Sequence, residues 1–457
     1  MERLEKYKKV LKLALPAVGE MLLYMLIWTV DTLMVGKYGG RVAVSAVGLS
    51  GQILYTVSAI FSAMGIGVAL TSLVSRKIGE ENGEEANIYG SIGFFMGVAI
   101  SLVLGVLFFT LPQEFLKFAN ARGEVLLLGS IYLKISSFAL LMTIWRGLLN
   151  GIIRGAQNTK IPLYTTAVMT VVNLGLDYLL IFGKMGFPEM GVKGAAIATV
   201  AANLVGFLYT MFYLQKYSCI SLGLCMGIKS SHLLYLKDKW WEIMKIALPA
   251  SFQEGAISIS RLAAVFIIMI LGETAFSANQ IALTVESISF MPGWGFAVAA
   301  TSLAGLKIGE KNYEEAEDMI GICLQMGIVV MGVIAFSFVL FPEFLISLFI
   351  KIEEKEVISL GATCLMIASL EQIPLAYSMI VSGALRGMGD TKTPFYISVF
   401  SHWFIRLPLI YYLIYLKRYP VYYVWIVQIF HWIIDGGLLY IFYKKKINAL
   451  LKYKVKN

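Results

Sequence analysis

Twelve apolar runs, each long enough to cross a lipid bilayer, constrain the fold of this 457-residue chain more than any other feature. A helix needs about 20 apolar residues to span the hydrocarbon core. Because backbone groups in lipid must be paired within their own segment, these runs are expected to be α-helices. The alternating strands that a membrane barrel requires are absent from the sequence. The runs begin near Leu11, Val44, Tyr89, Val125, Ile161, Ala195, Ile243, Phe276, Met319, Val357, Pro394 and Tyr423.

Composition and charge agree with a membrane protein. The chain is 58% hydrophobic and only 15% charged, whereas soluble chains are about 45–50% apolar and about 25% charged. The net charge of +9 does not indicate nucleic acid, because the basic residues gather at the chain ends and in a few connectors. That distribution is typical of a cytoplasmic membrane face beside anionic lipid.

The chain also repeats itself. Lys77–Ala86 (KIGEENGEEA) matches Lys307–Ala316 (KIGEKNYEEA) at eight of ten positions, an offset of 230 residues (307 minus 77). Arg154–Tyr164 matches Arg386–Tyr396 at six of eleven positions, an offset of 232 (386 minus 154). Ordered matches at nearly one offset predict a duplication, with six helices in each half.

We therefore predict an all-α membrane protein with an N-lobe at 1–228 and a C-lobe at 229–457. An even number of helices gives both halves the same orientation, so the two bundles are expected to be related by a pseudo-twofold axis along the membrane normal. Lysine and arginine are more frequent in the connectors after even-numbered runs and at the chain ends. This bias predicts a multi-pass protein of the cell membrane with both termini cytoplasmic. We expect a monomer whose other contacts are with membrane lipids.

Two aspartates lie at membrane depth in the first half. Asp31 is about 21 residues into its run, or about 31 Å from the cytoplasmic end, and Asp177 is about 24 Å along its own run. Asn173 precedes Asp177 by four residues and shares its helix face. The three side chains are predicted to form an oxygen-rich Na⁺ site or a carboxylate pair that shares a proton. The alternative is a buried hydrogen-bond network that joins helices.

Two glutamates lie near the middle of runs in the second half. Glu254 is expected about 13 Å, and Glu371 about 22 Å, from the same membrane face. Such carboxyl groups can change protonation state when buried, and they attract organic cations. The alternative is that each simply pairs with Arg261 or Arg406. In the first half, Glu20 is a weaker candidate that could line a cavity near the cytoplasmic end.

Pro16 and Pro249 occupy matching positions in the two halves, each within the repeated sequence ALPA. Proline removes a backbone hydrogen bond and kinks a helix, so both residues are candidate hinges. The alternative is that proline is simply tolerated in the first turns.

Several enzyme classes are excluded by missing motifs. The sequence has no GxxxxGK[ST] phosphate-binding loop, and its three histidines, His232, His402 and His431, form no HExxH motif. No cofactor is expected. Secondary transport is the functional class that remains.

The set of motifs resembles the multidrug and toxic compound extrusion (MATE) family over nearly the whole chain. The resemblance implies two six-helix bundles, a central cavity and alternating access. It also implies export of small cationic or amphipathic substrates in exchange for Na⁺ or H⁺. The motifs are ALPA, VDTLMVG (Val30–Gly36), the two KIGE loops, the two RG-x3-TK-x-P loops, VNLGLDYLLIFG (Val172–Gly183) and GVKGAAIAT (Gly191–Thr199).

By motif, the resemblance assigns Asp31, Asn173 and Asp177 to an N-lobe cation site. It adds Thr199 as a hydroxyl ligand, so that these four residues form the candidate Na⁺ ligand set.

In the C-lobe, Glu254 matches the glutamate in the seventh helix of NorM-like members, and Glu371 falls where those members have an aspartate. Ile367 stands where those members have tyrosine, so the sequence departs from their pattern for a C-lobe Na⁺ site. The resemblance thus leaves open whether the coupling ion is Na⁺ or H⁺.

Two other functions compete with drug export. A flippase for lipid-linked oligosaccharides would belong to the same superfamily, but such flippases usually carry more basic residues in the cavity. A membrane-embedded enzyme would need a catalytic cluster that the sequence does not contain.

Overall fold

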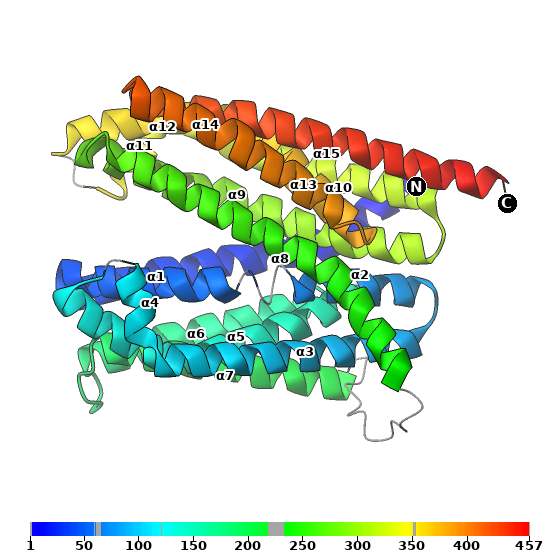
Figure 1. Ribbon diagram of the computed structural model, residues 1–457, viewed down its shortest axis with the longest axis horizontal. Helices are drawn as coiled ribbons and strands as arrows, with labels where there is room; N and C mark the ends of the chain where they lie inside the picture. The colour runs from blue at the N-terminus through cyan, green and yellow to red at the C-terminus, as the bar shows by residue number, and fades with distance from the viewer. Residues whose placement is uncertain are drawn as a thin grey trace. The chain divides into compact units, whose positions relative to one another are not determined.

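The computed structural model describes residues 2–58, 60, 65–119, 121–217, 233–350 and 353–456. Within these ranges every regular element is a helix (Figure 1). The first half holds α1 (Glu2–Ser58), α2 (Ile66–Gly79), α3 (Gly83–Thr110), α4 (Pro112–Phe118), α5 (Gly123–Gly155), α6 (Lys160–Phe182) and α7 (Val192–Tyr217). The second half holds α8 (Leu233–Met269), α9 (Glu273–Gly309), α10 (Tyr313–Leu340), α11 (Pro342–Ser347), α12 (Lys355–Gly387), α13 (Lys392–Phe400), η3 (Ser401–Arg406), α14 (Leu407–Ile410), η4 (Tyr411–Leu416) and α15 (Tyr422–Lys456).

Among the described residues, 11 helices are long and apolar enough to cross a membrane. The predicted second run is described in two parts, because residues 59 and 61–64 lie outside the described residues. Its first part, Val42–Ser58, is a shorter apolar helix that forms the second segment of α1. The two segments of α1 meet in a kink at Gly40, where the backbone has φ 59° and ψ −150°. Its second part is α2. Glycine suits the kink because residues with a Cβ rarely adopt positive φ.

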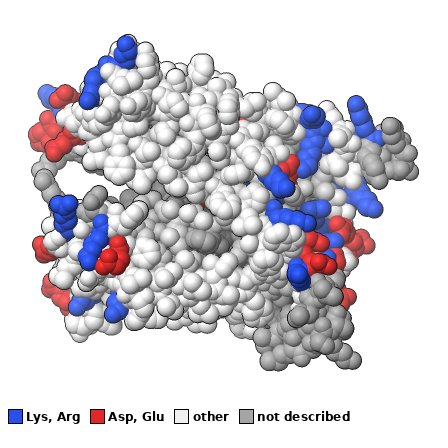
Figure 2. All heavy atoms as spheres, viewed as in Figure 1, with Lys and Arg blue, Asp and Glu red and all other residues white. Residues whose placement is uncertain are grey.

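The all-α membrane fold is therefore confirmed. On the face seen in Figure 2, charged side chains gather at the ends of the helices and leave an uncharged band between them. An uncharged band around helix middles is what a lipid environment requires.

The chain divides into two compact units that do not follow its order in sequence. The N-terminal unit is Gly19–Ser251, and the C-terminal unit combines Met1–Val18 with Phe252–Asn457. Both α1 and α8 therefore start in one unit and continue in the other. The predicted lobe boundary at 228/229 lies outside the described residues, and it stays a prediction.

Apolar packing explains why each helix start belongs to the opposite unit. Val10 and Leu13 of α1 are buried in the same hydrophobic cluster as Phe296 of α9. In the N-terminal unit, Ile243 of α8 is buried in the cluster that contains Leu148 of α5. Each fully buried side chain of this kind is worth about 1.5–3 kcal/mol, so the exchanged segments are firmly packed.

The two candidate hinge prolines lie at these crossing points. Pro16 is two residues before Val18, where the C-terminal unit gives way to the N-terminal unit, and Pro249 is two residues before Ser251. Both are inside their helices. A proline inside a helix leaves a carbonyl of the preceding turn without its partner and permits bending.

The repeated KIGE loops fold alike. In the N-terminal unit, Lys77 forms ion pairs with Glu80 at 2.7 Å and Glu85 at 2.5 Å, and Asn82 caps α3 through the backbone N–H of Glu85. Lys239, from the exchanged start of α8, reaches the same Glu85 at 2.8 Å. The start of α8 is thus held by charge as well as by apolar contact.

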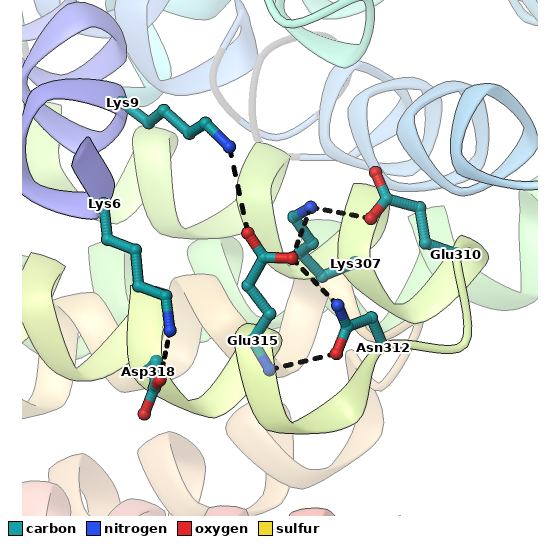
Figure 3. Close-up of polar contacts among 7 residues, drawn as sticks. All are labelled: Lys6, Lys9, Lys307, Glu310, Asn312, Glu315 and Asp318. Carbon is teal, nitrogen blue, oxygen red and sulfur yellow. Dashed lines mark hydrogen bonds and ion pairs between the residues drawn. The ribbon is translucent and has the colours of Figure 1, made fainter. Parts of the chain in front are cut away.

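The C-terminal unit repeats this arrangement (Figure 3). Lys307 pairs with Glu310 at 2.6 Å and with Glu315 at 2.9 Å. From the exchanged start of α1, Lys9 approaches Glu315 at 4.0 Å and Lys6 pairs with Asp318 at 2.7 Å. The duplication seen in the sequence therefore extends to how each crossing helix is anchored.

Helix packing is duplicated as well. The Thr71 hydroxyl of α2 donates to the Gly151 carbonyl of α5 at 2.9 Å, and the Thr301 hydroxyl of α9 donates to the Gly383 carbonyl of α12 at 2.9 Å. Small residues at such contacts let helix backbones approach closely in membranes.

Candidate functional site

Asp31 of α1 and Asp177 of α6 lie side by side in the N-terminal unit. Their carboxyl groups are within hydrogen-bonding reach of one another, although 146 residues separate them in sequence (177 minus 31). Asp177 has no exposed surface, and Asp31 is half-buried with its Oδ1 enclosed. The sequence prediction that both acids belong to one site is consistent with this geometry.

The oxygens of this pair have few other partners. Asp31 Oδ1 and both carboxyl oxygens of Asp177 are buried and have no hydrogen-bond partner among the described residues. Two carboxylates in contact repel strongly unless they share a proton or flank a cation. The pair is therefore chemically suited to take up H⁺ or a small metal cation.

Asn173 lies one turn before Asp177 on α6, as the sequence predicted, and is only 1% exposed. Neither Oδ1 nor Nδ2 of Asn173 has a hydrogen-bond partner in the described part of the chain. A buried amide without partners costs about 1–3 kcal/mol, so an unsatisfied oxygen at this position favours a ligand.

A tyrosine hydroxyl from α5 lies near the acids, and a threonine hydroxyl from α7 lies near that tyrosine. Tyr132 of α5 is within hydrogen-bonding reach of Thr199 of α7 and within electrostatic range of both Asp31 and Asp177. Thr199 donates its own hydroxyl proton to the Ala195 carbonyl at 2.9 Å, which leaves its oxygen lone pairs available. Sequence reasoning missed Tyr132, because one tyrosine among 24 gives no depth or charge signal.

In the C-terminal unit, the predicted glutamates lie beside different arginines. Glu254 is buried and within electrostatic range of Arg386. Glu371 is buried near Glu286 and Arg406. For Glu371, pairing with Arg406 was the alternative to a functional role, and the proximity fits it. The charged neighbour of Glu254 is Arg386, which sequence reasoning had not considered.

Glu286 joins Glu371 and the two predicted arginines in a charge-balanced cluster. Its carboxylate accepts a long hydrogen bond from Gln372 at 3.4 Å and lies within range of Arg261 and Arg406. Two carboxylates and two guanidinium groups can neutralise one another. This cluster therefore has less need of an external cation than the aspartate pair.

Glu20 forms an ion pair with Arg154, a partner that the sequence did not indicate. Its Oε1 accepts a 2.6 Å hydrogen bond from Arg154 of α5, and its side chain is fully buried. The pair joins α1 to α5 close to the cytoplasmic end predicted for both helices.

The two halves of the chain match one family model. The model described as MatE covers residues 16–179 and again residues 249–412. The second match begins 233 residues after the first (249 minus 16), the offset of the two ALPA sequences. Pro16 and Pro249 open the two matched segments.

Curated relatives cover most of the chain. A probable multidrug resistance protein NorM of Thermotoga maritima is 33% identical over 411 residues, which are 88% of this chain and 84% of the relative. A probable multidrug resistance protein NorM of Agrobacterium fabrum is 30% identical and covers 88% of this chain and 86% of its own length.

Solved structures share the fold. The crystal structure of a MATE in complex with MaL6 has a TM-score of 0.90 at 20% identity, covering 98% of this chain and 97% of the other. An outward-facing multidrug resistance MATE family transporter of the MOP superfamily has a TM-score of 0.88 at 20% identity, covering 97% and 96%.

Proposed function

The chain belongs to the MATE family of membrane transporters, and from this premise we propose that it exports organic cations and amphipathic drugs in exchange for Na⁺ or H⁺. The relatives at 30% identity or more are named as multidrug resistance proteins. The single observation that carries the coupling mechanism is the contact between the carboxyl groups of Asp31 and Asp177.

In this mechanism the aspartate pair alternates between two states. In one state the acids share H⁺ or hold Na⁺ with Asn173 and Thr199. In the other the ion has left, and repulsion between two buried carboxylates favours separation of α1 from α6. Ion uptake therefore changes the relative stability of two helix arrangements, which is what coupling requires.

We place the coupled bending at Pro16 and Pro249. Each proline precedes the point where its helix passes from one unit into the other, so bending there changes the path of a helix shared by both. Movement of α1 is transmitted directly to Asp31, which lies fifteen residues beyond Pro16 on the same helix.

Glu254 and Glu371 are proposed to contribute to attraction of cationic substrates. Their arginine neighbours reduce this contribution, so we expect the N-terminal acids to dominate ion coupling. We therefore expect the C-terminal glutamates to act mainly in substrate recognition.

The flippase alternative is less well supported. The relatives are named for multidrug resistance, and the acids of the predicted N-lobe site have no basic residue among the neighbours described above. An enzyme is excluded by the same relatives, which are transporters. We further propose a monomer in the cell membrane, with membrane lipids around it and both termini in the cytoplasm.

Efflux from proteoliposomes tests the proposal. A fluorescent organic cation should leave vesicles when either a Na⁺ or an H⁺ gradient is imposed, and Asp31→Asn should abolish the response. Asp238→Asn, at an exposed aspartate, is the matched control and should transport normally. Unchanged gradient-driven efflux by Asp31→Asn would refute the coupling role of the pair.

A further inference from the structure

Three side chains of metal-ligand type meet inside the C-terminal unit, on elements that the transport mechanism does not use. His402 comes from η3, and His431 and Asp435 come from α15. One ligand atom from each residue lies within 4.8 Å of those from the other two. The side chains are 3%, 0% and 0% exposed, respectively. Ionisable groups at membrane depth are costly, so a functional role is the default expectation.

The local backbone brings the three groups together. His431 and Asp435 are four residues apart on a helix, a spacing that puts both side chains on one face. His402 lies in a π-helical turn, and such turns are frequent at functional sites. The rings of His402 and His431 are in contact, with Nδ1 and Nε2 separated by 3.2 Å.

Neighbouring groups hold these side chains in place. Asp435 accepts hydrogen bonds from the hydroxyls of Ser378 at 2.6 Å and Ser401 at 2.5 Å. His402 Nδ1 lies 2.9 Å from the Ser398 carbonyl. Hydrogen bonds from hydroxyls to a ligand carboxylate, and between a ligand imidazole and a carbonyl, are typical of metal sites.

We propose that His402, His431 and Asp435 form a binding site for a divalent transition-metal ion of the Zn²⁺ class. Two imidazoles and one carboxylate suit Zn²⁺, whereas Mg²⁺ and Ca²⁺ prefer sites made of oxygen. Ligand atoms about 2 Å from one tetrahedral ion are about 3.3 Å apart. The most widely separated ligand atoms of the cluster therefore need to approach one another by up to about 1.5 Å on binding, and water supplies the remaining coordination position.

Nearby charge permits this assignment. Arg406 lies within electrostatic range of both imidazoles, and Arg261 lies within range of His402, which disfavours a cation. However, Arg406 is also within range of Glu286 and Glu371, and these carboxylates offset its charge. A metal ion bound here would link η3 to α15 and stabilise the packing of the last two membrane-spanning segments.

Metal binding to the intact, purified chain tests the site. The metal-free protein is titrated with Co²⁺, whose visible spectrum reports nitrogen and oxygen ligands, and its zinc content is measured after exposure to Zn²⁺ and dialysis. We expect about one ion per chain, with affinity lowered at least about tenfold in His431→Gln and in Asp435→Asn. His232→Gln removes the third histidine of the chain, which lies outside the described residues, and should bind metal as the parent does.

Two results would overturn the assignment. One is stoichiometric binding that survives in the His402→Gln/His431→Gln double variant, and the other is binding that disappears in His232→Gln. If the ligand variants fail to fold, zinc-edge X-ray absorption of the parent protein decides the question. Two imidazole ligands at about 2.0 Å are expected, and a spectrum without imidazole scattering would refute the site.

Discussion

The Arg154 guanidinium donates a 2.6 Å hydrogen bond to the Glu20 carboxylate, and the Glu20 side chain is fully enclosed. Removal of one partner from a buried ion pair leaves the other charge uncompensated. Glu20→Gln is therefore expected to lower the free energy of unfolding by about 3 kcal/mol. Thermal unfolding in detergent measures the change. Glu20→Gln/Arg154→Met should recover most of the loss, whereas equal losses in the single and double variants would contradict the pairing.

The Tyr132 hydroxyl is predicted to support the ion site next to Asp31 and Asp177. Tyr132→Phe keeps the ring and removes the hydroxyl, whose contribution we set at about 1.4 kcal/mol, or about tenfold in cation affinity. The concentration of Na⁺ or H⁺ that gives half-maximal efflux should shift by that factor. Tyr164→Phe changes an exposed tyrosine and is the control. An unchanged ion dependence in Tyr132→Phe would remove this tyrosine from the site.

The hinge proposal predicts that replacing either proline slows transport without lowering the stability of the fold. Pro16→Ala and Pro249→Ala each restore a backbone N–H inside a helix, so both variants should fold at least as stably as the parent. Their efflux rates are expected to fall by about fivefold or more, since gating motions often limit the rate of turnover. Pro112→Ala alters a proline in the first turn of α4, where no helical hydrogen bond is at stake, and should transport normally. Full efflux by both hinge variants would show that the prolines are merely tolerated.

A pH-dependent contribution to stability is expected from Asp390, in the loop before α13. Burial raises the pKa of Asp390, but hydrogen bonds from the Thr393 N–H and from Lys446 lower it by more, so the net pKa is below its ordinary value of 3.8. A carboxylate with a lowered pKa stabilises the fold above its unfolded pKa, and the benefit is lost as pH falls through the folded value.

Asp390→Asn should therefore lower the free energy of unfolding by about 1 kcal/mol at pH 7, because it removes the charge that pairs with Lys446. The difference from the parent protein should shrink as the pH falls below the ordinary value of 3.8, because the parent carboxyl then becomes protonated too. Unfolding curves at several pH values check both statements. A deficit that persists undiminished at pH 3 would mean that charge at Asp390 is not the cause.

Much of this fold could be read from the sequence because lipid imposes simple rules. The apolar runs and the two KIGE loops predicted the spans and the duplication. The exchange of helix starts could not be predicted, because the ALPA repeats mark equivalent positions without revealing which unit each segment packs against. That choice depends on contacts such as Val10 with the cluster around Phe296, which are 286 residues apart (296 minus 10).

The candidate sites were predictable to different degrees. Asp31 and Asp177 stood out because charge is rare at their depth, and helix rise alone put them at similar levels. Tyr132 did not stand out, since tyrosine is also an ordinary packing residue. His402 and His431 come from different elements, so no fixed spacing in the sequence indicated that their rings would meet.

Close helix packing at Gly383 gives the last prediction. A Cβ at this position would lie 2.4 Å from the Ala297 carbonyl oxygen and 3.1 Å from its Cα, both of them backbone atoms of α9. Because backbone cannot move aside as a side chain can, Gly383→Ala is expected to destabilise the C-terminal unit by about 2–3 kcal/mol and to weaken the Thr301 hydrogen bond to the Gly383 carbonyl. Gly332→Ala, in the middle of α10, adds a Cβ that meets no described heavy atom within 4 Å beyond its own stretch of helix. This change should instead stabilise by up to about 1 kcal/mol through helix propensity. Opposite signs for the two changes in thermal unfolding are the expected result, and a neutral Gly383→Ala would mean that α9 and α12 are further apart than described.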